Sequence, residues 1–80
     1  MIIVALKSKS NFESKLKSIL DTAKLRKATG IVILTDRAWH MEIFDYMLKH
    51  KGIGRIKMAG ETYFTVKSMR IEVKPVDFYI

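Results

Sequence analysis

MIIVAL (Met1–Leu6) and GIVILTD (Gly30–Asp36) decide the fold of this chain. Each is a short, continuous apolar run of the kind that forms a buried strand. The segment between them repeats its apolar residues at helical spacing. Two buried strands joined by a helix form a parallel crossover unit, so the sequence predicts an α/β domain.

The connecting helix is predicted to begin at Ser10, because Glu13 three positions later completes a capping-box pattern. Gly30 is expected to end it. One helix face is apolar and is expected to be buried; its residues are Phe12, Leu16, Ile19, Leu20 and Ala23. The opposite face carries Glu13, Lys17, Asp21 and Lys24, either as a solvated surface with weak ion pairs or as a binding surface.

A second helix is predicted after the strand Ile31–Leu34, capped by Thr35 or Asp36 and ending at Lys51 before Gly52. Apolar residues cover more than half of its circumference, which is more than one sheet face can bury. Two alternatives follow. Either the helix is wedged between the sheet and the first helix, or it offers side chains to a partner. The candidates for partner binding are Trp39, Met41 and Phe44.

From Arg55 onward apolar and polar residues alternate, which predicts half-buried antiparallel strands. Turns are expected at Ala59–Glu61 and near Lys67 and Ser68. The predicted fold is therefore α/β, on the border of α+β, in the order β-α-β-α followed by an antiparallel hairpin or meander. We expect a mixed sheet with both helices on one face, in a single domain over residues 1–80.

The composition limits the class of protein. The apolar fraction of 49% argues against disorder, and 80 residues bury too little surface for high stability, so a partner or homodimer is expected. The chain has no cysteine, so disulfides and thiolate metal sites are excluded. Met1–Leu6 is too short for a signal peptide or a membrane span, which favours a soluble, cytoplasmic protein without membrane contact.

The net charge is +7, and much of it lies between Lys7 and Lys27, where seven Lys or Arg residues face only two acids. A positive field of this kind attracts nucleic acid, DNA or RNA, or an acidic protein. A lysine-rich composition without any such partner is the alternative. The candidate phosphate-binding residues of this segment are Lys7, Lys9, Lys24 and Lys27.

The alternating strands supply a second candidate surface. Their polar face would carry Tyr63 as a stacking platform, surrounded by the cations Arg55, Lys57, Lys67, Arg70 and Lys74. The alternative is that lysines on exposed strands only prevent pairing between sheet edges.

Catalysis has weaker support. Glu72 and Lys74 resemble the Glu-x-Lys half of a metal-dependent nuclease site, but neither Glu61 nor Asp77 is well placed as the second acid. His40 and His50 are ten residues apart and face different sides of one helix, which does not suit a shared metal. We therefore expect no catalytic residues, no metal and no cofactor.

The order MIIVAL, helix, GIVILTD, helix, then SMRIEVKPVD and a closing FYI resembles the first half of the P-loop ATPase domain of helicases and phage terminase large subunits. The resemblance covers nearly the whole chain in order and pattern. The family's Gly-x-x-x-x-Gly-Lys-Ser/Thr motif is absent from Leu6–Ser14, and the chain ends at Ile80, before the acidic magnesium ligand that follows the family's last strand. The resemblance implies a truncated, degenerate scaffold without nucleotide hydrolysis.

Together these features favour a small, non-catalytic nucleic-acid-binding accessory protein, and the resemblance adds a phage origin. The alternative is a modulator, an inhibitor or adaptor, that binds a larger acidic protein through the second helix. A nuclease using Glu72 and Lys74 is the minor alternative.

Overall fold

The computed structural model describes residues 1–50, 52–58 and 61–78, without the side chains of residues 55–58, 61 and 62. It contains two helices, α1 (Phe12–Leu25) and α2 (His40–Lys49). Five strands accompany them: β1 (Ile2–Leu6), β2 (Gly30–Asp36), β3 (Gly54–Met58), β4 (Glu61–Val66) and β5 (Met69–Val76). The predicted α/β order is confirmed.

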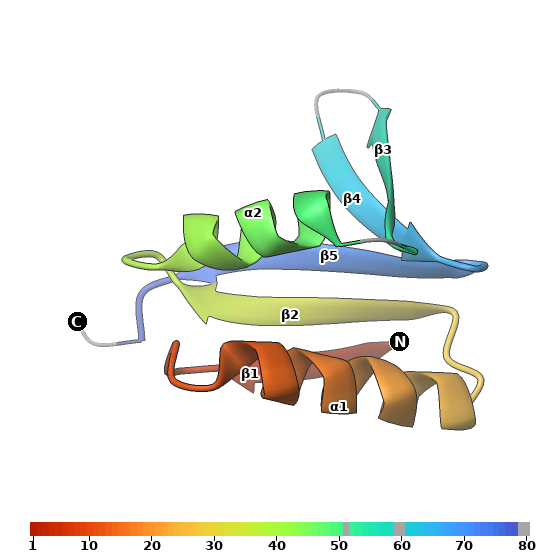
Figure 1. Ribbon diagram of the computed structural model, residues 1–80, viewed down its shortest axis with the longest axis horizontal. Coiled ribbons are helices and arrows are strands. Elements are labelled where there is room, and N and C mark those ends of the chain that lie inside the picture. Colours follow the sequence, from red (N-terminus) through yellow and green to blue (C-terminus); the bar gives the residue numbers. More distant parts are fainter. Residues whose placement is uncertain (51, 59–60, 79–80) are drawn as a thin grey trace.

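The strands form one mixed sheet in the order β1-β2-β5-β4-β3 (Figure 1). β2 pairs in parallel with β1 on one side and with β5 on the other. β4 runs antiparallel to both β5 and β3. The last strand of the chain therefore lies in the middle of the sheet, between β2 and β4.

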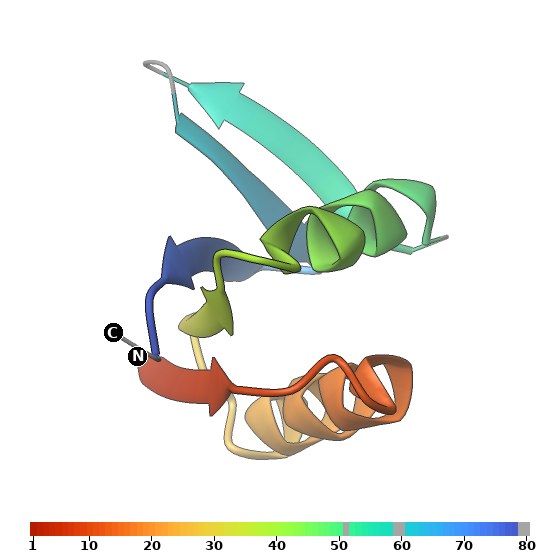
Figure 2. The same cartoon turned by 90° about the vertical axis from the view of Figure 1, so that its left-hand side faces the viewer.

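Both helices cover the same face of the sheet (Figure 2). The core lies between the layers, where Ile33, Phe64 and Ile71 from the sheet pack in one cluster with Leu16 of α1 and Ile43 of α2. No described helix covers the opposite face. Strands with one covered face alternate buried and exposed residues, and β5 does so at its amino end.

The start of α1 differs from the prediction. Its N-cap is Asn11, in the left-handed conformation with φ 55°, and no side chain forms a cap hydrogen bond. The backbone N–H of Ser10 instead donates to the hydroxyl of Ser8. The predicted Ser10–Glu13 capping box is therefore wrong, because the left-handed turn at Asn11 delays the helix until Phe12.

The end of α1 also comes earlier than predicted. The Ala28 N–H donates to the Ala23 carbonyl at 3.0 Å, and the Lys27 N–H donates to the Lys24 carbonyl at 3.0 Å. With φ 54° at Lys27 these bonds form a Schellman motif, in which the left-handed position is usually glycine. Lys27 thus ends the helix, and Gly30, the predicted end, lies in β2.

The predicted caps of α2 are also wrong, because the strand before the helix is longer than predicted. Thr35 and Asp36 are still part of β2, and the N-cap is Trp39, without a side-chain cap hydrogen bond. The Asp36 carboxylate accepts the Ala38 N–H at 2.9 Å, which stabilises the turn before the helix. The helix ends at Lys49, since His50 is extended, and the predicted end at Lys51 lies outside the described residues.

α2 is not wedged between the sheet and α1, because both helices lie on the same face of the sheet (Figure 2); α2 contacts the sheet and α1 through one aromatic pair each. Phe44 contacts Phe64 of the sheet edge-on, with ring centroids 5.1 Å apart. Tyr46 contacts Phe12 of α1 in the same way at 5.6 Å. These two pairs connect α2 both to the sheet and to α1. Aromatic pairs of this geometry add to the stability that burial alone provides.

Candidate nucleic-acid interface

The four predicted cations of the first segment lie at two opposite ends of the molecule. Lys7 and Lys9 follow β1, at the left of Figure 1, whereas Lys24 and Lys27 lie at the far end of α1, on the right. At 1.5 Å per residue, α1 separates them by roughly 20 Å. A single compact binding site cannot include both pairs.

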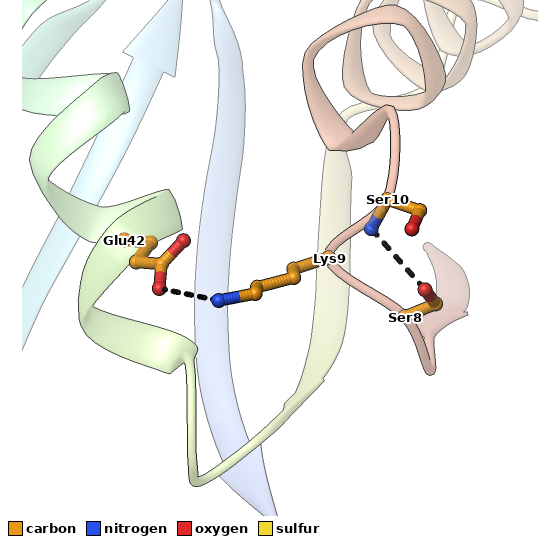
Figure 3. A network of polar contacts seen from close by, with 4 residues as sticks. All are labelled: Ser8, Lys9, Ser10 and Glu42. Atoms are coloured by element: carbon orange, nitrogen blue, oxygen red, sulfur yellow. Dashed lines mark hydrogen bonds and ion pairs between the residues drawn. The ribbon is translucent and has the colours of Figure 1, made fainter.

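At the end of the molecule that follows β1, Lys7 and Lys9 already interact with other side chains. The ammonium group of Lys9 lies 3.4 Å from a carboxylate oxygen of Glu42 on α2, across the ends of β2 and β5 (Figure 3). The ammonium group of Lys7 lies 5.9 Å from the ring centroid of Phe78. Because the Lys9–Glu42 pair is exposed it contributes little stability, but Glu42 lowers the positive potential of this loop.

At the second end, three lysines from two distant segments meet. Lys24 and Lys27 come from the end of α1, and Lys67 comes from the turn between β4 and β5. Together they surround an open hollow of about 320 Å³, which we call the lysine hollow. Its remaining lining residues are Ala28, Thr29, Val66, Ser68 and Met69.

The lysine hollow has no acidic lining residue. Within the described part of the chain, none of its three lysines forms an ion pair. Like charges around one depression that has no acidic residue in its lining create a positive potential that favours an anion. Lysine binds phosphate as a point charge, so a phosphate group is an anion that suits this hollow.

Two of the three lysines have a backbone conformation that is unfavourable for a side chain. Lys27 has φ 54° and Lys67 has φ 56°, both in the left-handed region. Val66 and Met69 pair across the β4–β5 turn, so Lys67 is the first residue of a two-residue hairpin loop. A positive φ at that position alone characterises a type II′ turn, which favours glycine there.

The exposed face of the sheet carries the second predicted surface, in part. The guanidinium carbon of Arg70 lies 3.9 Å from the ring centroid of Tyr63. Arg70 and Lys74 both pair with Glu72, at 3.0 and 3.4 Å. The side chains of Arg55 and Lys57 lie outside the described residues. Tyr63, Arg70 and Lys74 are thus brought together, whereas Lys67 belongs to the lysine hollow.

The nuclease alternative meets an obstacle at Glu72. Both of its carboxylate oxygens are used, one by Arg70 and the other by Lys74. Among the described residues, no group of three His, Cys, Asp or Glu side chains could hold a metal ion. A metal at Glu72 would have to displace two cations, which does not favour the nuclease interpretation.

The candidate partner-binding residues of α2 have different environments. Trp39 is only 9% exposed and belongs to the core, and Phe44 is half-buried against Phe64. Met41 is 58% exposed. Leu48, which was not among these candidates, is 41% exposed and lies seven residues, two helical turns, after Met41.

A larger groove of about 550 Å³ separates α1 from the end of α2. The charged face of α1 forms one wall, with Glu13, Lys17, Asp21 and Lys24, and Tyr46 and His50 of α2 line the other. Its charges have both signs, so an anion gains less here than in the lysine hollow.

No model of a protein family, no curated protein and no solved structure matches this chain. The resemblance to the P-loop ATPase domain therefore stays a prediction. Within the described ranges, neither helix is long and apolar enough to cross a membrane.

Proposed function

We propose that this chain is a non-catalytic nucleic-acid-binding protein that contacts backbone phosphates through the lysine hollow. The observation that carries the proposal is the convergence of Lys24, Lys27 and Lys67 around a depression without acidic lining. Phosphate contacts supply most of the sequence-independent affinity of such proteins, so strong sequence preference is not expected from this site.

The backbone at two of these lysines supports the proposal. A residue other than glycine in the left-handed conformation costs about 1–2 kcal/mol, and the chain has this cost at both Lys27 and Lys67. Strained backbone positions gather at functional sites. Lys27 and Lys67 lie in two unrelated turns, and both line the lysine hollow. Phosphate binding by their ammonium groups explains why lysine occupies both strained positions.

The test is a binding titration by fluorescence anisotropy with short labelled DNA and RNA, single-stranded and double-stranded, at several salt concentrations. We expect affinity to fall with salt at a log–log slope of about −2 to −3 if three phosphates are contacted. Changing Lys24, Lys27 and Lys67 together to Gln should make the slope shallower by roughly 2 and weaken binding at low salt.

The matched control removes the same kind of charge elsewhere. Lys9, Lys15 and Lys49 are exposed and lie outside the lysine hollow. Their triple change to Gln lowers the net charge equally, so it should leave the salt slope and most of the affinity in place. An equal loss of affinity and of salt slope in the two triple variants would mean that overall charge, not the lysine hollow, determines binding, and the proposal would fail.

The second candidate function is protein binding through α2, and the exposure of Met41 and Leu48 favours it. Exposed apolar residues two turns apart form one stripe, which is a usual contact for a partner helix or a second copy. Analytical ultracentrifugation over a range of concentrations tests the second copy. A Met41→Ser, Leu48→Ser variant should then remain folded and lose any self-association that the unchanged chain shows.

A further inference from the structure

We propose that β1 is a docking edge for an extended, acidic segment of a partner protein, which adds to the sheet as a further strand. The groove between β1 and α1 receives side chains of this segment, and Arg26 pairs with one of its carboxylates. The surface is separate from the lysine hollow, because the two share no lining residue. The inference therefore goes beyond the proposed function and does not depend on it.

β1 is an edge strand of the sheet. It stands first in the strand order β1-β2-β5-β4-β3, and within the described ranges it pairs with β2 alone. The register with β2 runs without a break from Ile2 to Leu6, so β1 has no bulge that would turn its outer edge away. The backbone N–H and C=O groups of such an edge are a template for another strand.

The sequence of β1 does not protect this edge. All five of its residues, IIVAL, are apolar, whereas the sequence of the other edge strand, β3, contains Arg55 and Lys57. Charged residues, above all lysine, are a usual means of preventing pairing at a sheet edge. Ile3 of β1 is 67% exposed, on the side of the strand opposite to Ile2 and Val4. An added strand would bury this side chain.

The helix side of the same edge is hollowed. A groove of about 240 Å³ lies between β1 and α1, and Ile2 and Val4 line it from the strand. Its lining residues from α1 are Ser18, Ile19, Thr22, Ala23 and Arg26. Because side chains alternate along a strand, every second residue of an added strand would enter this groove, and the residues between would lie beside Ile3. The small and apolar lining favours small apolar side chains.

The charge of the groove determines which partner fits. Arg26 is the one charged residue in its lining. The side chain is exposed, and within the part of the chain that the structure describes it forms no ion pair. A carboxylate of the added strand can bind its guanidinium group through two hydrogen bonds. A second copy of β1 would bring no acid and a further net charge of +7, so an acidic partner fits this edge better.

The experiment is a titration of the isotope-labelled chain followed by NMR, which reports affinity and position together. The probe is a short peptide of alternating valine and threonine with a glutamate near each end, and its counterpart has lysine in place of glutamate. At low salt the glutamate peptide should shift the amide signals of β1. It should bind about two- to fivefold more tightly than the lysine peptide, the range that an exposed ion pair supplies.

Two charge reversals show whether Arg26 is responsible. Arg26→Glu should reverse the preference, because the new carboxylate attracts the lysine peptide. Lys49→Glu is the matched control, since Lys49 is exposed, lies on α2 and does not line the groove. The two variants have the same net charge, so Lys49→Glu should keep the preference for glutamate.

Two further comparisons test the addition of a strand. Methylation of the peptide's backbone nitrogens removes its ladder donors and should weaken binding at least about tenfold, although its side chains are unchanged. Ile3→Ser should weaken the binding of both peptides, because it removes the apolar contact on the uncovered sheet face. Ile3 is exposed, so this variant should fold, and the unchanged spread of its amide signals checks that.

The inference is overturned if neither peptide shifts the amide signals of β1, if the preference for glutamate survives Arg26→Glu, or if the methylated peptide binds as well as the original. Self-association in analytical ultracentrifugation that Ile3→Ser abolishes also overturns it, since a second copy would then cover the edge. Changing Lys24, Lys27 and Lys67 together to Gln should leave peptide binding in place. A failure of the proposed function is thereby distinguished from a failure of this inference.

Discussion

Replacing Lys27 by Gly should stabilise the protein. Lys27 is the left-handed residue of the Schellman motif that ends α1, with φ 54° and hydrogen bonds of 3.0 Å from Lys27 to Lys24 and from Ala28 to Ala23. These are backbone bonds, so the substitution leaves them in place. Its effect comes from the removal of Cβ, which crowds the backbone in this conformation.

The magnitude follows from two opposing terms. The left-handed conformation costs a residue with a side chain about 1–2 kcal/mol. Glycine loses more backbone entropy on folding, which costs about 0.5–1 kcal/mol. With the middle of each range, the gain is about 0.75 kcal/mol, and in a domain of this size that raises Tm by about 3–6 °C.

The assay is thermal unfolding followed by circular dichroism, with Lys27→Ala as the matched control. Alanine has the same Cβ as lysine, so it should leave Tm nearly unchanged while removing the same charge. Both variants should weaken nucleic-acid binding equally if the ammonium group acts in the lysine hollow. A Lys27→Gly variant that is no more stable than Lys27→Ala would refute the left-handed conformation and with it the argument from strain.

The remaining predictions concern α2 and the loop after β1. Phe44→Ser should lower the free energy of unfolding by about 2–5 kcal/mol, measured in urea, because Phe44 packs on Phe64, whereas the exposed Met41→Ser should change it by less than about 0.5 kcal/mol. Similar losses for both would contradict this packing. Trp39, 9% exposed, should have a blue-shifted emission that acrylamide quenches poorly, and efficient quenching would place it at the surface instead. Calorimetry with ATP and magnesium should show no binding, because the Ser10 N–H is already bonded to Ser8 and the loop has no glycine; micromolar binding that Lys9→Ala abolishes would reverse this expectation.

The sequence predicted the type of nearly every element, since the type depends on the spacing of apolar residues along the chain. The apolar stripe of α1 is buried as predicted at Leu16 and Ala23, and the alternating pattern after Arg55 does form antiparallel strands. Element ends were predicted less well. Gly30 is the helix end that the sequence predicts, because glycine takes the left-handed conformation without strain, and no local pattern indicates that Lys27 takes it instead.

The candidate site also depends partly on local sequence and partly on the tertiary structure. By itself the sequence determined that the chain is an α/β domain with net charge +7, that Lys67 and Ser68 form a turn, and that Lys24 belongs to the first helix. These features depend on neighbours along the chain. Only the tertiary structure decided that β5 lies between β2 and β4, which places the β4–β5 turn beside the end of α1. Strand order depends on which apolar faces bury one another across long sequence separations, and residue spacing within a segment carries no information about that choice.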